Sequence, residues 1–277
     1  MFLIPFIPSL SVAYKALQLA LGQSKSSDLN TPRLSSMDNF RDMAGLTSAY
    51  SGTAGTLRSG MVYRSNAVTP SPSDLRTLET LGIRLVLDLR DTSEIDQTPD
   101  VLPKDATYRH LNVLGSRFAQ LDPATFKLES SQQAFDFMVE TNRAFVVSTP
   151  VREVLSQVIL AIAEADGPVL FHCSAGKDRT GWIAALLHYI AWLDDATVMS
   201  DYLATNTYTA QRINATLAMM PEELRALYAP AMWVDRAYLN AALDEANTRY
   251  GSVQGYLHSG LGLSNETLTK LKTKLVL

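Results

Sequence analysis

The chain has 277 residues, of which 47% are hydrophobic and 19% are charged, and its formal net charge is −4. This composition is typical of a folded chain with one large or two small domains. It excludes long disorder and the basic field that nucleic-acid binding requires. One cysteine excludes an intrachain disulfide, which predicts a reducing, cytoplasmic location. The four histidines show no ligand-pair spacing, so we expect no metal and no other cofactor.

The first part of the chain is predicted to stand apart, with residues 1–32 as an apolar arm and linker and residues 33–277 as the domain. Residues 1–10 are apolar but contain two prolines and no basic start. They fit neither a signal peptide nor a membrane span. Residues 12–21 can form one or two amphipathic turns. We favour packing against the domain or a homodimer contact over peripheral membrane contact.

Beyond the linker, short apolar runs alternate with segments of helical period, which is typical of strands joined by crossover helices. We expect strands at residues 61–64, 83–89 and 108–113. A helix capped by Ser73 should run to residue 80, with Gly82 closing it. These segments predict an α/β fold.

The middle of the chain contains an irregular stretch followed by two helices. Residues 114–130 show no clear period, and an irregular loop of that length in a compact domain is usually functional. A helix is predicted at residues 132–146. A second helix should open at Thr149, with its hydroxyl as the cap ahead of Pro150, and should end at Gly167.

The single cysteine lies between a short strand, residues 168–171, and a helix, residues 180–192, that is apolar on nearly every side. It forms the pattern His172-Cys173, five residues, Arg179 and then a threonine. The apolar helix should be central in the fold, and the rest of the chain is mostly helical in period. Because open α/β sheets place their sites at the carboxyl ends of strands, both position and motif indicate a functional loop.

The spacing in this loop predicts phosphate chemistry. Its backbone N–H groups can curl around a tetrahedral oxyanion at the start of a helix, and Gly176 supplies the backbone freedom for that curl. Arg179 can hold two phosphate oxygens, while the loop and a Thr180 hydroxyl stabilise the Cys173 thiolate. Cys173 would take the phosphoryl group and water would release it. The residues expected to bind the substrate are Ser174, Ala175, Gly176, Lys177 and Thr180.

Both chemical steps need a proton shuttle. Asp178 is the nearest carboxylate, and its alternative is a surface carboxylate paired with Lys177 or Arg179. Asp122, in the irregular stretch, is the other candidate if a closing lid brings it in. The carboxylate of Asp235 is discounted, because residues 233–235 look helical.

His172 has two interpretations of its own. We favour a structural role, in which the ring orients the loop through a hydrogen bond to the backbone, over proton transfer.

Residues 172–181 resemble the signature loop of cysteine-dependent protein tyrosine phosphatases. Their Gly-Lys-Asp-Arg-Thr-Gly version is similar to the tyrosine/lipid phosphatases of bacteria and fungi. Other segments of that branch are resembled, in the same order, by residues 39–42 (Asn-Phe-Arg-Asp), by residues 87–90 (with Asp88 and Arg90) together with Glu94 beyond them, and by residues 201–203. Two segments depart from it: residues 43–45 read Met-Ala-Gly, and residues 114–148 match nothing, so the family's lid is not carried over.

The resemblance implies a single phosphatase domain with a central, mostly parallel sheet flanked by helices, a helical C-terminal part, and no metal. It implies Cys173 as nucleophile and Arg179 as phosphate ligand, with Lys177 and Asp178 contributing to catalysis or to the binding of further phosphates. The residues of the matching motifs expected to support the site are His172, Asp88, Arg90 and Arg41.

The leading hypothesis is therefore a metal-independent phosphomonoesterase, in first place a protein tyrosine or dual-specificity phosphatase. A phosphoinositide or a small-molecule phosphate is the alternative substrate. A sulfur-transfer enzyme and a silent phosphate-binding module are the competing classes. The complete His-Cys-five-Arg-Thr spacing argues against the first, and the presence of both Cys173 and Arg179 argues against the second.

Overall fold

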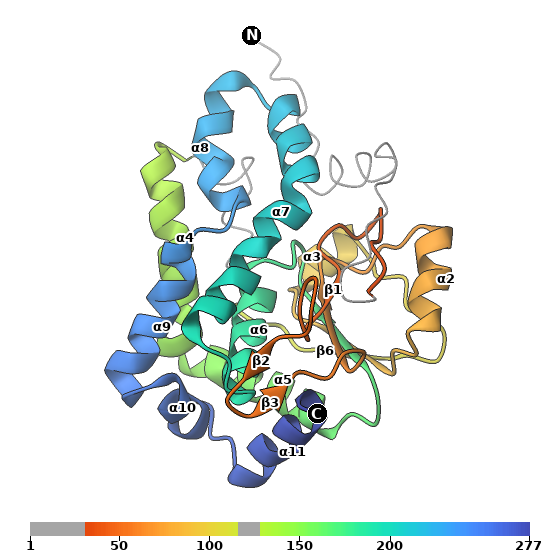
Figure 1. The fold of residues 1–277 in the computed structure, drawn as a ribbon. Coiled ribbons are helices and arrows are strands. Elements are labelled where there is room, and N and C mark those ends of the chain that lie inside the picture. The colour runs from red at the N-terminus through yellow and green to blue at the C-terminus, as the bar shows by residue number, and fades with distance from the viewer. Residues whose placement is uncertain (1–30, 116–127) are drawn as a thin grey trace.

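The structure is a computed structural model that describes residues 31–115 and 128–277 (Figure 1). Nearly all of the arm, and the candidate Asp122, lie outside these ranges. The expectations for both therefore stay predictions.

A five-stranded sheet forms the centre of the fold. In spatial order its strands are β1 (Arg41–Asp42), β4 (Val62–Ser65), β7 (Val169–His172), β5 (Leu85–Asp88) and β6 (Thr107–His110). Strand β1 runs antiparallel to β4, whereas the other neighbours are parallel. The predicted mostly parallel sheet is confirmed. A separate hairpin consists of β2 (Ser51–Gly52) and β3 (Gly55–Thr56).

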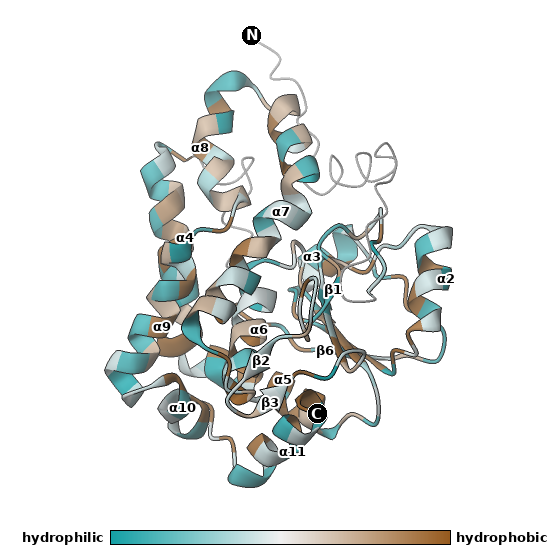
Figure 2. Cartoon of the chain, viewed as in Figure 1, coloured by the Kyte–Doolittle hydropathy of each residue, from teal (hydrophilic) through white to brown (hydrophobic). Residues whose placement is uncertain are grey.

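Helices flank the sheet and make up the C-terminal part, as predicted (Figure 1). They are α2 (Pro72–Thr80), α3 (Thr92–Gln97), α4 (Ser131–Val147), α5 (Thr149–Glu164), α6 (Asp178–Ile190), α7 (Asp195–Met219), α8 (Glu222–Met232), α9 (Arg236–Tyr250), α10 (Val253–Gly255), the π-helix η2 (Tyr256–Gly260) and α11 (Asn265–Leu275). Figure 2 shows α8, α9 and α11 carrying both hydrophilic and hydrophobic residues, as expected for helices that bury one face.

Two of the predicted helix caps are wrong. The cap of α2 is Ser71, whose hydroxyl accepts a hydrogen bond from the Asp74 amide, while Ser73 lies inside the first turn. The cap of α5 is Ser148, and it makes no side-chain capping bond. The Thr149 hydroxyl instead accepts from the Arg152 guanidinium at 3.0 Å.

Two further boundaries also differ from the expectation. Helix α6 begins at Asp178 instead of residue 180, because the end of the cysteine loop already has helical backbone. Residues 233–235 are not helical. They connect α8 to α9, where Asp235 serves as the cap of α9.

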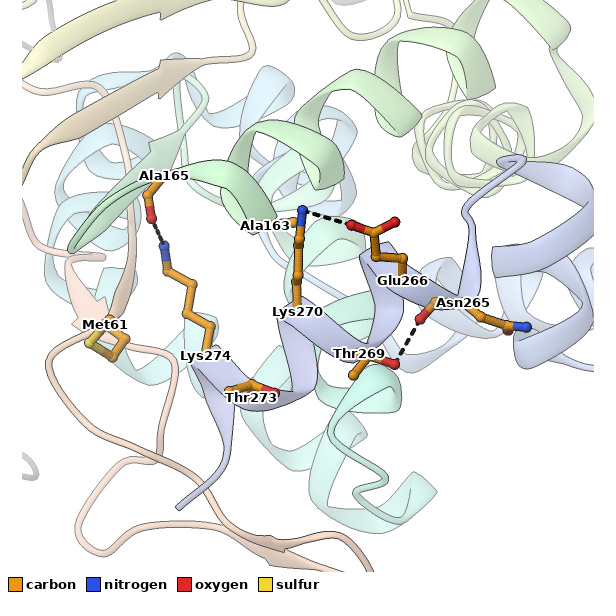
Figure 3. A pocket seen from close by; sticks show the side chains of 9 residues that line it. All are labelled: Met61, Ala163, Ala165, Asn265, Glu266, Thr269, Lys270, Thr273 and Lys274. Atoms are coloured by element: carbon orange, nitrogen blue, oxygen red, sulfur yellow. Dashed lines mark hydrogen bonds and ion pairs between the residues drawn. The ribbon is translucent and has the colours of Figure 1, made fainter.

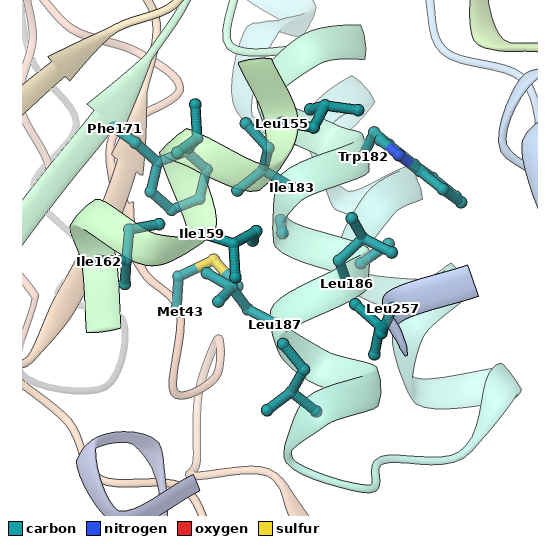
Figure 4. Packing of buried hydrophobic residues seen from close by; sticks show 14 of the residues in the cluster. Met43, Leu155, Ile159, Ile162, Phe171, Trp182, Ile183, Leu186, Leu187 and Leu257 are labelled. Carbon is teal, nitrogen blue, oxygen red and sulfur yellow. The ribbon is translucent and has the colours of Figure 1, made fainter. Parts of the chain in front are cut away.

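The core packs around α6, which is buried on nearly every side as predicted. Figure 4 shows Leu155 and Ile159 of α5 packing with Ile183 and Leu187 of α6 against Phe171 of β7. Each of these side chains is at most 1% exposed. Burying one such side chain contributes roughly 2 kcal/mol, so α6 is held firmly beneath the end of β7.

Within the described ranges, no single helix has both the length and the apolar composition of a membrane span. Helices α4 and α5 have the length and apolar composition of a span only when they are taken together, and the chain bends by 72° between them.

Candidate active site

The cysteine loop, residues 173–179, connects the carboxyl end of β7 to the start of α6. In the sheet register, Ser65 at the end of β4 and Asp88 at the end of β5 both pair with His172. The segments that follow these two strands therefore flank the loop on both sides. The predicted position, at the carboxyl edge of a parallel sheet and under a buried helix, is confirmed.

Gly176 allows the loop to curl against β4. Its φ is +66°, and a Cβ atom at this position would lie 2.6 Å from the carbonyl carbon and oxygen of Ser65. A side chain would therefore collide with backbone as well as strain φ. The predicted need for glycine is confirmed.

Arg179 is fixed by Glu94 of α3. Its Nη1 and Nη2 atoms each lie 2.7 Å from one Glu94 oxygen, a bidentate pair. The Ser174 hydroxyl also donates to Glu94. Burial disfavours the charged forms of both side chains, but the hydrogen bonds and the attraction between them outweigh this effect. The pKa of Arg179 is therefore raised and that of Glu94 is lowered.

Sequence reasoning did not place Glu94 among the site residues. A local signal for its placement exists, because Asp91 and Glu94 have the spacing of a capping box at the start of α3. The Asp91 carboxylate accepts from the Glu94 amide, and the Asp91 amide donates to the Glu94 carboxylate at 3.0 Å. The box orients the Glu94 carboxylate locally, but nothing in the spacing identifies Arg179 as its distant partner.

Cys173 is 3% exposed and belongs to the main hydrophobic cluster, at the floor of the loop. Thr180 is fully buried, and its hydroxyl has no hydrogen-bond partner in the described part of the chain. The predicted hydrogen bond from Thr180 to the cysteine sulfur is therefore not formed. Because α6 starts two residues early, Thr180 lies within the helix and no longer at its entrance.

Lys177 is bound by the end of α8 and the connection to α9, and Asp178 lies beside Lys177 and Asn142 of α4. The Lys177 ammonium donates to the carbonyls of Ala231 and Trp233 and lies 3.5 Å from Asp178. Asp178 is only 4% exposed, and the Asn142 side chain donates to it at 3.4 Å. The alternative of a surface carboxylate is thus wrong, although the pairing with Lys177 is present.

The His172 ring faces two carboxylates, those of Asp88 at the end of β5 and of Asp100. Its Nε2 lies 3.1 Å from Asp100 and 3.9 Å from Asp88, and no described residue forms the expected ring-to-backbone hydrogen bond. Arg90 binds both carboxylates, at 2.7 Å and 2.8 Å. Burial would raise the pKa of Asp88, but the charges of His172 and Arg90 hold it below its ordinary value.

The Asp88, Asp100 and His172 ligand atoms lie within 4.8 Å of one another, a spacing that could hold a metal ion. The Arg90 guanidinium already supplies positive charge to both carboxylates, and a cation between them would repel it. This donor set therefore fits a structural ion-pair cluster better than a metal site.

A second buried cluster supports the loop from the β4 side. Asp201 of α7 forms ion pairs with Arg64 of β4 at 2.9 Å and with Arg41 of β1 at 3.5 Å. Burial opposes the ionised Asp201, but the two arginines outweigh it and lower its pKa to about 2. Burial lowers the pKa of Arg64 to about 10, which still leaves the group charged at neutral pH. The sequence predicts a supporting role for Arg41, whereas its motifs do not identify Arg64 or Asp201 as members of the site.

A pocket of about 540 Å³ lies at the opposite edge of the sheet (Figure 3). It includes Met61, just before β4, and Ala165, upstream of β7, so it sits at the amino ends of the strands. Lys274 donates to the Ala165 carbonyl at 2.7 Å, and Lys270 pairs with Glu266 at 3.1 Å. The cations that line this pocket are thus engaged, and it does not adjoin the cysteine loop.

Residues 32–277 match the model of the tyrosine phosphatase family. The chain belongs to this family. It is therefore a phosphoric monoester hydrolase, and a cysteine nucleophile is general to its family. The resemblance and the predicted phosphatase activity are confirmed, while the roles of the individual residues stay predictions.

Three relatives illustrate the match. A protein of Cupriavidus necator, provisionally named a tyrosine-protein phosphatase, is 31% identical over 230 residues, 81% of this chain and 82% of the relative. The triple specificity protein phosphatase PtpB of Mycobacterium tuberculosis is 28% identical, over 84% of this chain and 95% of its own. A tyrosine-protein phosphatase of Nostoc commune is 29% identical, over 73% and 69%.

Proposed function

We propose that the protein is a protein tyrosine or dual-specificity phosphatase that works through a phosphoryl group on Cys173. The observation that carries the proposal is the loop itself. Its cysteine lies at the end of β7, its backbone is curled at Gly176, and Glu94 orients its arginine. This arrangement supports attack on a phosphate held by backbone N–H groups and one guanidinium.

In the first step the Cys173 thiolate attacks phosphorus, and the bond from phosphorus to the ester oxygen breaks. Asp178 donates its proton to the departing oxygen, which leaves as an alcohol or phenol. In the second step a water oxygen attacks phosphorus, Asp178 takes one water proton, and the sulfur–phosphorus bond breaks. Inorganic phosphate is released and the thiolate is restored. Arg179 would hold the equatorial oxygens throughout.

The identity of the substrate beyond its phosphate is a finer proposal. The relative from Mycobacterium tuberculosis is named a triple specificity protein phosphatase. We therefore include phosphoserine and phosphothreonine in proteins, besides phosphotyrosine, among the proposed substrates. A phosphoinositide or a small-molecule phosphate stays the alternative. A cytoplasmic location, a homodimer contact and the absence of nucleic-acid and membrane partners also stay predictions.

The test is hydrolysis of p-nitrophenyl phosphate with a chelator present, by the wild-type chain and by Cys173→Ser. We expect metal-independent turnover, competitive inhibition by vanadate and no turnover by the variant. Unchanged turnover by Cys173→Ser would refute the cysteinyl mechanism. Rates on phosphotyrosine, phosphoserine and phosphothreonine peptides, phosphoinositides, and sugar and prenyl phosphates would then rank the substrate classes.

A further inference from the structure

The side chain of Asn39 holds the cysteine loop by two successive carbonyl groups. Its Nδ2 atom donates to the Ala175 carbonyl at 2.9 Å and to the Gly176 carbonyl at 2.9 Å. Asn39 precedes β1 and is fully buried. It is separated from the two loop residues by 136 and 137 positions in the chain, so the contact depends on the folded sheet.

Two further donors bind the same outer side of the loop. The Ala67 amide donates to the Ser174 carbonyl at 3.2 Å. The Arg64 Nη2 atom donates to the Gly176 carbonyl at 3.0 Å. All three carbonyls from residue 174 to residue 176 are thus bound by groups outside the loop.

The direction of these carbonyls determines the direction of the next amides. In a planar trans peptide the C=O and N–H groups point to opposite sides, and the described residues contain no cis peptide bond. Carbonyls turned outward at residues 174–176 therefore turn the N–H groups of Ala175, Gly176 and Lys177 inward. No described residue accepts a hydrogen bond from these three amides, so they are available to an oxyanion above Cys173.

The orientation of the Asn39 amide is chemically determined. Arg41 Nη1 donates to Asn39 Oδ1 at 2.5 Å, and a guanidinium has no acceptor atom. The oxygen of the Asn39 amide must therefore face Arg41, which leaves Nδ2 to face the loop carbonyls. Arg41 is itself 1% exposed and fixed by Asp201, so the orientation is held by buried charge.

We propose that Asn39 is a positioning residue for the phosphate-binding amides of the loop. By binding the Ala175 and Gly176 carbonyls from outside, it holds the amides that follow them in the orientation that binds phosphate. The inference rests on the proposed function and assigns to Asn39 the inward direction of the Gly176 and Lys177 amides. Arg41 acts through Asn39 by fixing its amide. Arg64 supports the second of the two carbonyls.

The expected effect is large because oriented donors lose most of their value when the backbone can rotate. Losing one donor to a developing oxyanion costs roughly 100-fold to 1000-fold in rate, and Asn39 orients two. Asn39→Asp is the sharpest variant. It keeps the size of the side chain and the acceptor for Arg41, but it replaces the Nδ2 donor with an oxygen facing two carbonyls.

The experiment measures three properties of wild type and Asn39→Asp: kcat and KM for p-nitrophenyl phosphate, vanadate affinity, and the pH profile of Cys173 alkylation by iodoacetamide. We expect kcat/KM to fall roughly 100-fold, as for the loss of one oriented donor. We also expect weaker vanadate binding and an alkylation profile moved to higher pH. Asn39→Ser removes the same two hydrogen bonds to the loop carbonyls. It tests the role of Asn39 if Asn39→Asp does not fold.

Asp74→Ala is the matched control for a structural effect. Asp74 accepts three hydrogen bonds from Ser35 and Ser36 in the same N-terminal segment and touches no loop residue. We expect this control to lower the Tm and to leave vanadate affinity and alkylation unchanged.

Wild-type values for all three measurements in both folded Asn39 variants would overturn the proposal. A wild-type chain that hydrolyses no phosphate ester would instead refute the proposed function. Vanadate affinity and alkylation would still decide the role of Asn39, because neither needs turnover.

Discussion

The Arg179 guanidinium and the Glu94 carboxylate meet fork to fork, with both N···O distances at 2.7 Å. Glu94 comes from α3, beyond the end of β5, and Arg179 from the first turn of α6. Arg179 is 3% exposed in this pair. In the proposed mechanism, Glu94 therefore sets the position of the guanidinium that binds phosphate.

Glu94→Gln should lower kcat/KM by about tenfold to 100-fold. The substitution removes the negative charge and replaces one acceptor oxygen by an NH2 group that faces the Arg179 guanidinium. Steady-state kinetics on p-nitrophenyl phosphate measures the loss. Glu140→Gln is the control. It breaks an exposed ion pair with Arg143 and should leave the rate unchanged. Equal rates for the two variants would show that Glu94 does not orient Arg179.

Gly176→Ala should destabilise the protein far more than Gly82→Ala. Both glycines have φ near +65°, at +66° and +63°, so the backbone strain is similar, at about 1 kcal/mol. Only the Gly176 substitution also drives a Cβ atom to within 2.6 Å of Ser65, whereas nothing lies within 4 Å of the Gly82 position. Urea unfolding compares the two variants. Equal losses of stability would contradict the close approach of the loop to β4.

Asp178→Asn should slow the hydrolysis of poor leaving groups much more than that of good ones. A good leaving group departs without a proton, whereas an alkyl or unsubstituted phenyl oxygen needs one. The measurement is kcat/KM across aryl phosphates of graded phenol acidity. A uniform decrease would remove Asp178 as the general acid and direct attention to Asp122.

Asp201 should make the protein lose stability in acid. The folded-state pKa is about 2, below the ordinary value of 3.8, so the carboxylate stabilises the fold above pH 4. That contribution is lost as the pH falls from about 4 to 2, and it amounts to roughly 2 kcal/mol. Urea unfolding at several pH values measures the slope. Asp201→Asn should flatten this part of the profile, and an unchanged slope would contradict the assignment.

Much of the fold follows from local pattern. The strand before Cys173 and the apolar helix after it are predictable because burial on every side leaves a continuous apolar run. Boundaries are less predictable. Ser71 and Ser73 both flank Pro72, and the spacing does not show which hydroxyl caps α2. The break between α8 and α9 at residues 233–235 is also not predictable, because residues of helical composition continue across it.

The residues of the loop are enough to predict its chemistry. His172, Cys173, Gly176 and Arg179 lie within eight residues, and their spacing alone predicts a thiolate beneath a phosphate. This information is local, because a strand, a curled loop and a helix start are built from neighbouring residues.

The groups that hold that loop in place become visible only in the folded chain. Glu94 and Asn39 reach it across 85 and 136 positions, from elements that the mostly parallel sheet brings to one edge. No local spacing encodes such contacts, because the sheet pairs strands that are far apart in the chain and joined by connections of variable length.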